Sequence, residues 1–179
     1  MSNDDLSDVE AVLRGDVDRF EGIVTRWEKP LVNLAWRFVR SEAVAEEMAQ
    51  DAFVACYRKL GQWRREGEFS TWLFAVAMNV YRSHLRRSRL PIDDDAQLET
   101  LVAPASTDDL REEEQRGEIV RRAVTFLPPK YREAIVLYHF EERDISATAH
   151  ILGVAEGTLK ARLHRGRRLL KERLETLLR

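Results

Sequence analysis

Two stretches of this sequence combine the side chain types that bind nucleic acids. In residues 68–89 aromatic rings are interleaved with arginines, and a helical wheel predicts a buried stripe around Leu73. The side opposite this stripe carries Thr71, Ala75, Met78, Asn79, Arg82 and Arg86. Aromatic rings stack on unpaired bases and arginines pair with phosphates, so this face beside Trp72 is suited to single-stranded DNA. The alternative is that Phe69 and Trp72 are core aromatics, and for Phe69 the core is the preferred interpretation.

The second stretch, residues 145–170, has the layout of a helix-turn-helix. It combines a short helix over residues 146–152, a turn at Gly153 that favours a positive φ, and a longer helix from Glu156. One face of the longer helix is apolar and carries Leu159, Leu163, Gly166 and Leu170. The opposite face is basic and carries Lys160, Ala161, His164, Arg165 and Arg168, with Arg162 and Arg167 on its flanks. Basic residues alone are typical of a solvated helix, but the preceding helix and turn favour insertion into a major groove.

A third candidate, which we call the acidic ridge, lies in residues 42–60. The helix predicted there has one apolar side and one acidic and polar side, which carries Glu46, Glu47, Gln50 and Asp51. Such a ridge is typical of a solvated surface. It is also suited to docking a basic partner.

The sequence motifs of common enzymes are missing. The sequence contains no GxxxxGK[ST] or GxGxxG loop, the motifs that bind phosphates. It also contains no HExxH motif and no GxSxG motif. His84, His139, His150 and His164 are too dispersed for a metal ligand set. The single cysteine, Cys56, lies on an apolar stripe and is predicted to be a small core residue. The sequence therefore predicts no catalytic residue, no metal site and no cofactor.

The elements that position these residues are predicted to be helices throughout. Helical spacing of apolar residues covers residues 20–27, 31–38, 42–60, 70–89, 110–127, 131–138, 146–152 and 156–170. Pro30 is expected to break the helical pattern between residues 20–27 and 31–38. Ser41 stands where the N-cap of the helix over residues 42–60 belongs. Pro128 and Pro129 are expected to end the helix that precedes them.

Charge is distributed unevenly along the 179 residues, although the formal net charge is only −2. Residues 61–90 carry 6 basic and 2 acidic groups, and residues 119–179 carry 13 and 7, whereas residues 91–118 carry 2 and 10. Two basic blocks separated by an acidic one predict two surfaces that face polyanions. The simplest organisation is two helical domains, residues 1–90 and 116–179, joined by a flexible acidic linker over residues 91–115. The acidic N-terminus and the lack of a long apolar run favour a cytoplasmic protein.

Together these segments resemble the extracytoplasmic-function (ECF) sigma factors, the compact two-domain initiation factors of bacterial RNA polymerase. Residues 45–53 resemble the core-polymerase-binding segment of that family, and Phe69-Ser-Thr-Trp-Leu73 with Asn79 resembles its −10 element segment. Residues 127–133, then Ala149, Leu152-Gly-Val154 and residues 157–165, resemble its −35-reading domain. The resemblance covers nearly the whole chain.

The resemblance implies an all-α fold, with sigma region 2 in residues 1–90 and sigma region 4 in residues 116–179. It assigns core-polymerase binding to Glu46, Glu47, Gln50, Asp51, Phe53 and Tyr57. It assigns −10 DNA binding to Phe69, Ser70, Thr71, Trp72, Asn79, Arg82 and Arg86. It assigns −35 DNA binding to Thr158, Lys160, Ala161, Arg162, His164, Arg165, Arg167 and Arg168.

The partners that the resemblance implies are core RNA polymerase, promoter DNA and an anti-sigma factor. On the polymerase, the contacts would be a coiled coil of the largest subunit and the flap of the second-largest subunit. The protein would have no catalytic activity and no direct membrane insertion, and an anti-sigma factor could hold it at the inner face of the membrane. The alternative is a free-standing helix-turn-helix regulator with an effector or dimerisation domain, which would need neither the acidic ridge nor the aromatic–arginine helix.

Overall fold

The computed structural model describes residues 3–88 and 110–177, and every regular element in these ranges is helical. The α-helices are α1 (Asn3–Leu13), α2 (Phe20–Val39), α3 (Glu42–Lys59), α4 (Phe69–Ser88), α5 (Leu110–Thr125), α6 (Pro129–Ile135), α7 (Ile145–Leu152) and α8 (Glu156–Leu177). Short 3-10 turns cover Val17–Arg19 and Leu60–Gln62, and a π-helix covers Val136–Phe140. The all-α prediction is confirmed. Of the predicted linker, residues 91–109 lie outside the described residues, and residues 110–115 belong to α5.

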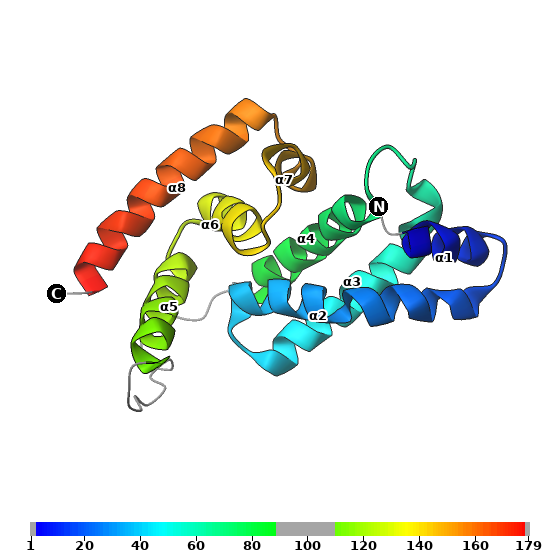
Figure 1. The fold of residues 1–179 in the computed structure, drawn as a ribbon, viewed down its shortest axis with the longest axis horizontal. Coiled ribbons are helices and arrows are strands. Elements are labelled where there is room, and N and C mark those ends of the chain that lie inside the picture. Colours follow the sequence, from blue (N-terminus) through cyan, green and yellow to red (C-terminus); the bar gives the residue numbers. More distant parts are fainter. Residues whose placement is uncertain (1–2, 89–109, 178–179) are drawn as a thin grey trace.

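Helices α1 to α4 form the N-terminal unit, on one side of Figure 1. Helices α2 and α3 pack along each other, and α4 packs on α3. Of the apolar residues at helical spacing, Ile23, Leu34, Met48 and Leu73 are fully buried between these helices, whereas Val24 and Trp27 are half-buried. Cys56 is also fully buried, and burial raises the pKa of its thiol to about 12. It is therefore a core residue, as its place on the apolar stripe predicts.

The prediction that Pro30 interrupts the chain is wrong, because Pro30 lies inside the continuous helix α2. A proline removes one backbone hydrogen bond and costs a helix interior about 3 kcal/mol. Here the apolar residues on both sides of it, Ile23 before and Leu31 and Leu34 after, are buried on the same face. Their packing against α3 offsets the cost and keeps both segments in one helix.

Helices α5 to α8 form the C-terminal unit, which contains the predicted helix-turn-helix in α7 and α8. Asp144 caps α7 by accepting a hydrogen bond from the Ala147 backbone N–H at 2.7 Å. Gly153 ends α7 with φ of 65°, the left-handed conformation that its lack of a side chain permits. Gly166 of α8 lies against Ile135, where an added Cβ would lie 3.1 Å from the Ile135 side chain. The glycine therefore lets α8 pack closely on α6.

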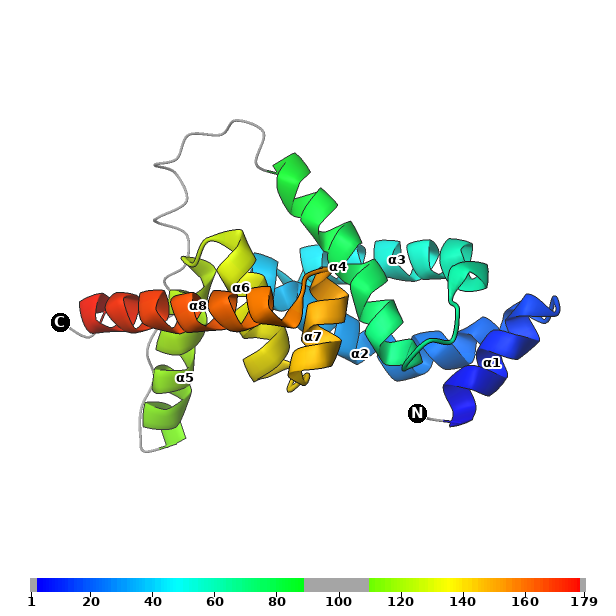
Figure 2. The same cartoon turned by 90° about the horizontal axis from the view of Figure 1, so that it is seen from above.

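The two units contact each other mainly through α4 and α7, which lie side by side in Figures 1 and 2, and also through α2 and α5. Phe74 and Met78 of α4 are buried on this side. In the ranges that the structure describes, no helix combines the length and apolar character needed to span a membrane.

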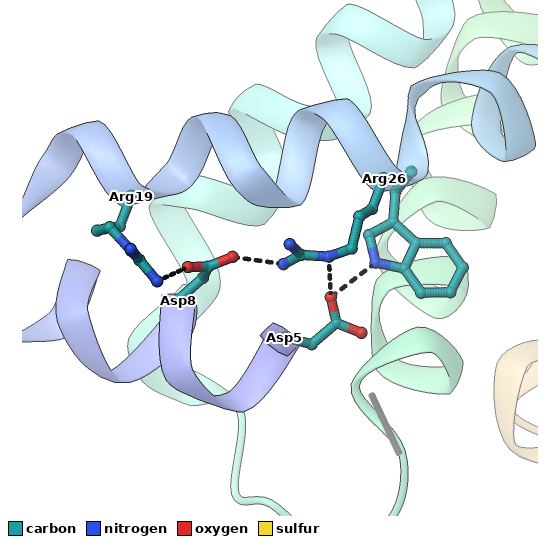
Figure 3. Close-up of polar contacts among 5 residues, drawn as sticks. Asp5, Asp8, Arg19 and Arg26 are labelled. Atoms are coloured by element: carbon teal, nitrogen blue, oxygen red, sulfur yellow. Dashed lines mark hydrogen bonds and ion pairs between the residues drawn. The ribbon is translucent and has the colours of Figure 1, made fainter. Parts of the chain in front are cut away.

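A network of charged groups fastens α1 to α2 (Figure 3). Arg26 donates to Asp5 at 2.9 Å and to Asp8 at 2.6 Å, and Arg19 pairs with Asp8 at 2.6 Å. An added Cβ at Gly22 would lie 2.5 Å from the Asp8 carboxylate, so glycine is needed for this close approach. Burial alone would raise the pKa of Asp8, but hydrogen bonding and charge from Arg26 and Arg19 outweigh it and hold that pKa below the ordinary 3.8.

Replacing Asp8 with Asn is expected to destabilise the chain by about 1–3 kcal/mol at pH 7, which lowers Tm by about 2–4 °C per kcal/mol. Because the pKa of Asp8 is depressed, its contribution is complete above pH 3.8 and is lost as the pH falls through the lowered value. Thermal unfolding at pH 7 and at stepwise lower pH measures the difference. Asp18→Asn, at an exposed carboxylate nearby, is the control. A deficit that persists at the lowest pH at which the chain still folds would contradict the charge-based account.

Candidate nucleic-acid interface

The acidic ridge is exposed along one side of α3. Its four predicted members are Glu46, Glu47, Gln50 and Asp51, and all are exposed. Tyr57 at the end of the ridge is 43% exposed. Its ring packs edge-on against the Phe20 ring, with 5.2 Å between the two ring centres. Phe53 is only 8% exposed and packs against Phe20 from the core side. A direct partner contact of the kind implied for Phe53 therefore has little surface available, since its ring supports Phe20 and through it Tyr57.

Sequence reasoning missed Val54, which is 48% exposed on the same side of α3. It follows Gln50 and Asp51 by four and three residues, the spacing that places side chains on one helix face. That spacing was a usable signal. The ridge thus has a charged part and a short apolar part, made by Val54 and Tyr57.

The face of α4 that was predicted to bind −10 DNA is partly exposed. Asn79 and Arg86 are exposed, and Thr71 and Trp72 are half-buried. Phe69 and Ser70 are buried at 2% and 7% exposure, so the core interpretation of Phe69 holds in this structure. The Phe69 ring packs against two indoles, and its centre lies 5.2 Å from the ring centre of Trp63 and 5.7 Å from that of Trp72.

Met78 corrects the helical-wheel prediction for α4, which placed it on the exposed side. It is 1% exposed, because the C-terminal unit covers this side of the helix through α7. Arg82, the next residue of this side, is half-buried. Its Nη1 donates to the Asn79 side chain oxygen at 3.3 Å, and its guanidinium also pairs with Glu133 of α6. The structure thus brings Arg82 and Asn79 together.

Thr71 and Trp72 face an open groove of about 580 Å³. It is lined by residues of the 62–68 segment and the start of α4, and by Asp144, Ala147 and His150 at the start of α7. An unpaired base could enter a groove of this size and stack on Trp72. The groove therefore joins part of the single-strand candidate face to the helix-turn-helix.

Helix α8 presents its two faces as the sequence predicts. Leu159, Leu163 and Gly166 are buried against the rest of the C-terminal unit. The basic face points outward, and its exposed members are Thr158, Lys160, Ala161, His164, Arg165, Arg167 and Arg168, with Arg162 half-buried. Long cationic side chains around the small Ala161 leave room for a duplex to approach the helix closely.

Arg167 has a partner within the protein. Its Nε donates to His139 Nε2 at 3.2 Å, and its guanidinium lies 6.0 Å from the Tyr138 ring centre. Burial and the Arg167 charge lower the pKa of His139, which keeps the imidazole neutral and able to accept this hydrogen bond. Arg167 is thereby held at the side of the basic face, where a phosphate contact is the expected role.

Two family models match this chain. Residues 23–90 match Sigma-70 region 2, and residues 117–170 match Sigma-70, region 4. The RNA polymerase sigma-H factor of Pseudomonas aeruginosa is 33% identical over 96% of this chain and 94% of its own length. The ECF RNA polymerase sigma factor SigW of Bacillus subtilis is 28% identical, with coverage of 94% and 96%. The sigma-E factor of Escherichia coli K12 is 29% identical, with coverage of 96% and 94%.

Solved structures share the fold. CnrH in complex with the cytosolic domain of CnrY matches with a TM-score of 0.72 at 22% identity, over 97% of this chain and 99% of that one. The sigma factor RpoE of Bartonella quintana, in complex with the anti-sigma factor NepR, matches with a TM-score of 0.65 at 24% identity, over 87% and 96%. The arrangement of two helical units is therefore found in other proteins.

Proposed function

This chain belongs to the ECF sigma factors, and we propose from that membership that it binds core RNA polymerase and directs promoter-specific initiation by reading a −35 duplex and capturing unpaired −10 DNA. The protein is an initiation factor without catalytic activity of its own. It acts in the cytoplasm, and an anti-sigma factor is its expected regulator.

Each surface has one role in this proposal. The acidic ridge of α3, with Val54 and Tyr57, docks on a basic part of the polymerase. Trp72, Asn79, Arg82 and Arg86 of α4 bind the separated strand, with Trp72 as the stacking platform. The outward face of α8 reads the −35 duplex in the major groove. We assign Phe53, Phe69 and Ser70, which are buried, to the support of these surfaces.

The observation that supports the proposal best is that one chain carries both the acidic ridge of α3 and the basic outward face of α8. A free-standing helix-turn-helix regulator would have a use for α8 but none for the acidic ridge. Run-off transcription with purified core polymerase distinguishes the two functions. A discrete transcript that appears only when this protein is added supports the sigma factor. Duplex binding without any transcript, on templates selected for that binding, would indicate the regulator.

The recognition helix offers a test that separates base reading from phosphate binding. Arg165→Ala is expected to cost about 1–3 kcal/mol of binding to a selected −35 duplex and to relax specificity at one base pair, because Arg165 lies on the outward face. Arg167→Ala, on the flank, is expected to weaken all sequences alike and to lower the salt slope by about one unit.

Fluorescence anisotropy over a salt series, on selected and scrambled duplexes, measures both effects. The two variants serve as controls for each other, since each removes one exposed arginine from the same helix. If both lose affinity equally for both duplexes, the basic face only clamps phosphates and the orientation assigned to α8 is wrong.

A further inference from the structure

One arginine of α8 is held at a single nitrogen and is open at its other two. Arg167 Nε donates to His139 Nε2 at 3.2 Å, across the junction between α8 and the π-helix. Within residues 3–88 and 110–177 the Arg167 guanidinium makes no other hydrogen bond, so Nη1 and Nη2 keep their donors. Parallel N–H donors of one guanidinium are the fork with which arginine binds a phosphate. Arg167 is therefore anchored at its base and open at its tip.

The charge of Arg167 is also uncompensated. Two other cations of α8 have partners on the same helix, since Arg168 pairs with Glu172 at 3.6 Å and Lys160 with Glu156 at 4.0 Å. In the part of the chain that the structure describes, no carboxylate pairs with Arg167 in this way. An exposed arginine without an internal counter-charge can neutralise a phosphate without first giving up an ion pair.

Close helix packing fixes the point from which the Arg167 side chain starts. The preceding residue, Gly166, is buried, and an added Cβ there would lie 3.1 Å from Ile135 and 3.4 Å from Tyr131. Helix α8 thus runs directly against α6, which continues into the π-helix that carries His139. The same close approach brings the Arg167 side chain to the π-helix.

The π-helix presents two neighbouring rings to this arginine. The rings of Tyr138 and His139 meet edge-on with 4.9 Å between their centres, and the Arg167 guanidinium lies 6.0 Å from the centre of the Tyr138 ring. Tyr138 is half-buried, whereas His139 is exposed. The half-buried ring therefore braces the imidazole while the imidazole accepts from Arg167. Single π-turns are frequent at functional sites.

The contact requires one particular form of the His139 imidazole. A neutral imidazole has one donor and one acceptor nitrogen, and because Nε2 accepts here, the proton belongs on Nδ1. Burial, and in addition the Arg167 charge, lower the pKa of His139 below the ordinary 6.5. The neutral form that can accept from Arg167 therefore prevails at neutral pH.

We propose that Arg167 and His139 form a phosphate site at the junction of α8 and the π-helix, in which His139 positions the guanidinium for a backbone phosphate of the −35 duplex. The inference rests on the proposed function of α8, and it adds a residue outside the helix-turn-helix to that surface. His139 is a positioning residue, since it acts through Arg167. An arginine that is already held in its binding geometry loses less conformational freedom when the duplex binds.

The first experiment tests the contact without DNA, by NMR of the imidazole nitrogens in the isotope-labelled chain. The chain has four histidines, and the spectrum of His139→Gln identifies the His139 signals. We expect the Nδ1–H tautomer at His139, and a higher His139 pKa in Arg167→Ala than in the wild type, because the variant lacks the charge that lowers it. Identical titration of His139 in both chains would show that the two side chains do not meet, and would overturn the proposal.

The second experiment measures duplex binding by fluorescence anisotropy over a salt series at about pH 8, where the imidazole is neutral. His139→Ala is expected to weaken binding about three- to tenfold, on selected and scrambled duplexes alike, because the released arginine must be ordered when it binds. The salt slope should stay unchanged, since the charge of Arg167 remains. Arg167→Ala differs, because it is expected to lower that slope.

Further variants separate positioning from an effect on the fold. His139→Gln is expected to restore most of the affinity, because its amide oxygen can accept from Arg167 in place of the imidazole. In an Arg167→Ala background, His139→Ala should cause no additional loss of binding. The control, His84→Ala, removes a half-buried imidazole from α4 and should leave duplex binding unchanged.

Unchanged or tighter duplex binding by His139→Ala would overturn the proposal, since the contact would then have no role or would withhold Arg167 from DNA. An equal loss from His139→Ala with and without Arg167 would also overturn it, because His139 would then act by itself. A failure of the proposed function has a different signature. Run-off transcription would then fail for the wild type, whereas the variants compared on scrambled duplexes would still report the phosphate site.

Discussion

Reversing the charges of Glu47 and Asp51 together, by Glu47→Lys and Asp51→Lys, is expected to lower the affinity for core RNA polymerase by about 100-fold. Both carboxylates are exposed on α3 and lie one helical turn apart. If each loses a favourable charge contact of about 1.4 kcal/mol, the two losses multiply to this factor. Surface plasmon resonance with immobilised core polymerase at two salt concentrations measures the change.

The control for this prediction is Glu21→Lys combined with Glu28→Lys, which makes the same change of net charge at exposed positions of α2. Binding of the free chain to a selected −35 duplex reports whether α8 is intact in both variants. Equal core affinity for the ridge variant, the control and the wild type would remove the docking role from the acidic ridge.

Replacing Trp72 and Asn79 with Ala is expected to reduce open-complex formation about tenfold or more, while closed-complex binding changes little. The indole ring of Trp72 faces the groove, and a stacked base contributes about 1–3 kcal/mol only after the strands have separated. Permanganate reactivity of unpaired thymines reports the open complex, and a gel shift at low temperature reports the closed one.

Trp36→Ala is the matched control, since Trp36 is another half-buried indole, on α2 beneath Arg40. Thermal unfolding of each variant separates loss of fold from loss of function. An equal decrease in the open and closed complexes would mean that Trp72 and Asn79 support the fold and do not bind the strand.

The elements whose partners are close in sequence could be predicted well. The buried face of α8, with Leu159 and Leu163, follows from helical spacing, and the end of α7 follows from Gly153. In these cases the determining physics is local, because one helix face and one turn decide the outcome.

What the sequence did not predict depends on contacts between distant segments. Met78 was placed on an exposed side, since a helical wheel contains no information about α7 packing there. The pairs of Arg82 with Glu133 and of Arg37 with Glu141 join residues 51 and 104 positions apart. No local pattern marks such partners, and helix propensity likewise failed at Pro30, where packing decided the outcome.

The π-helix of Val136–Phe140 has a consequence for changes of chain length between α6 and α7. A π-turn accommodates one more residue than an α-turn, and it lies between α6 and the loop that carries Glu141 and Arg143. Deleting one residue there would rotate everything downstream by about 100° about the helix axis. Glu133 precedes the π-helix and would keep its pairing with Arg82, whereas Glu141 would move away from Arg37, and Gly166 of α8 would move away from Ile135 of α6. The C-terminal unit is therefore not expected to tolerate a single insertion or deletion here, because the length of the π-helix sets how α8 packs on α6.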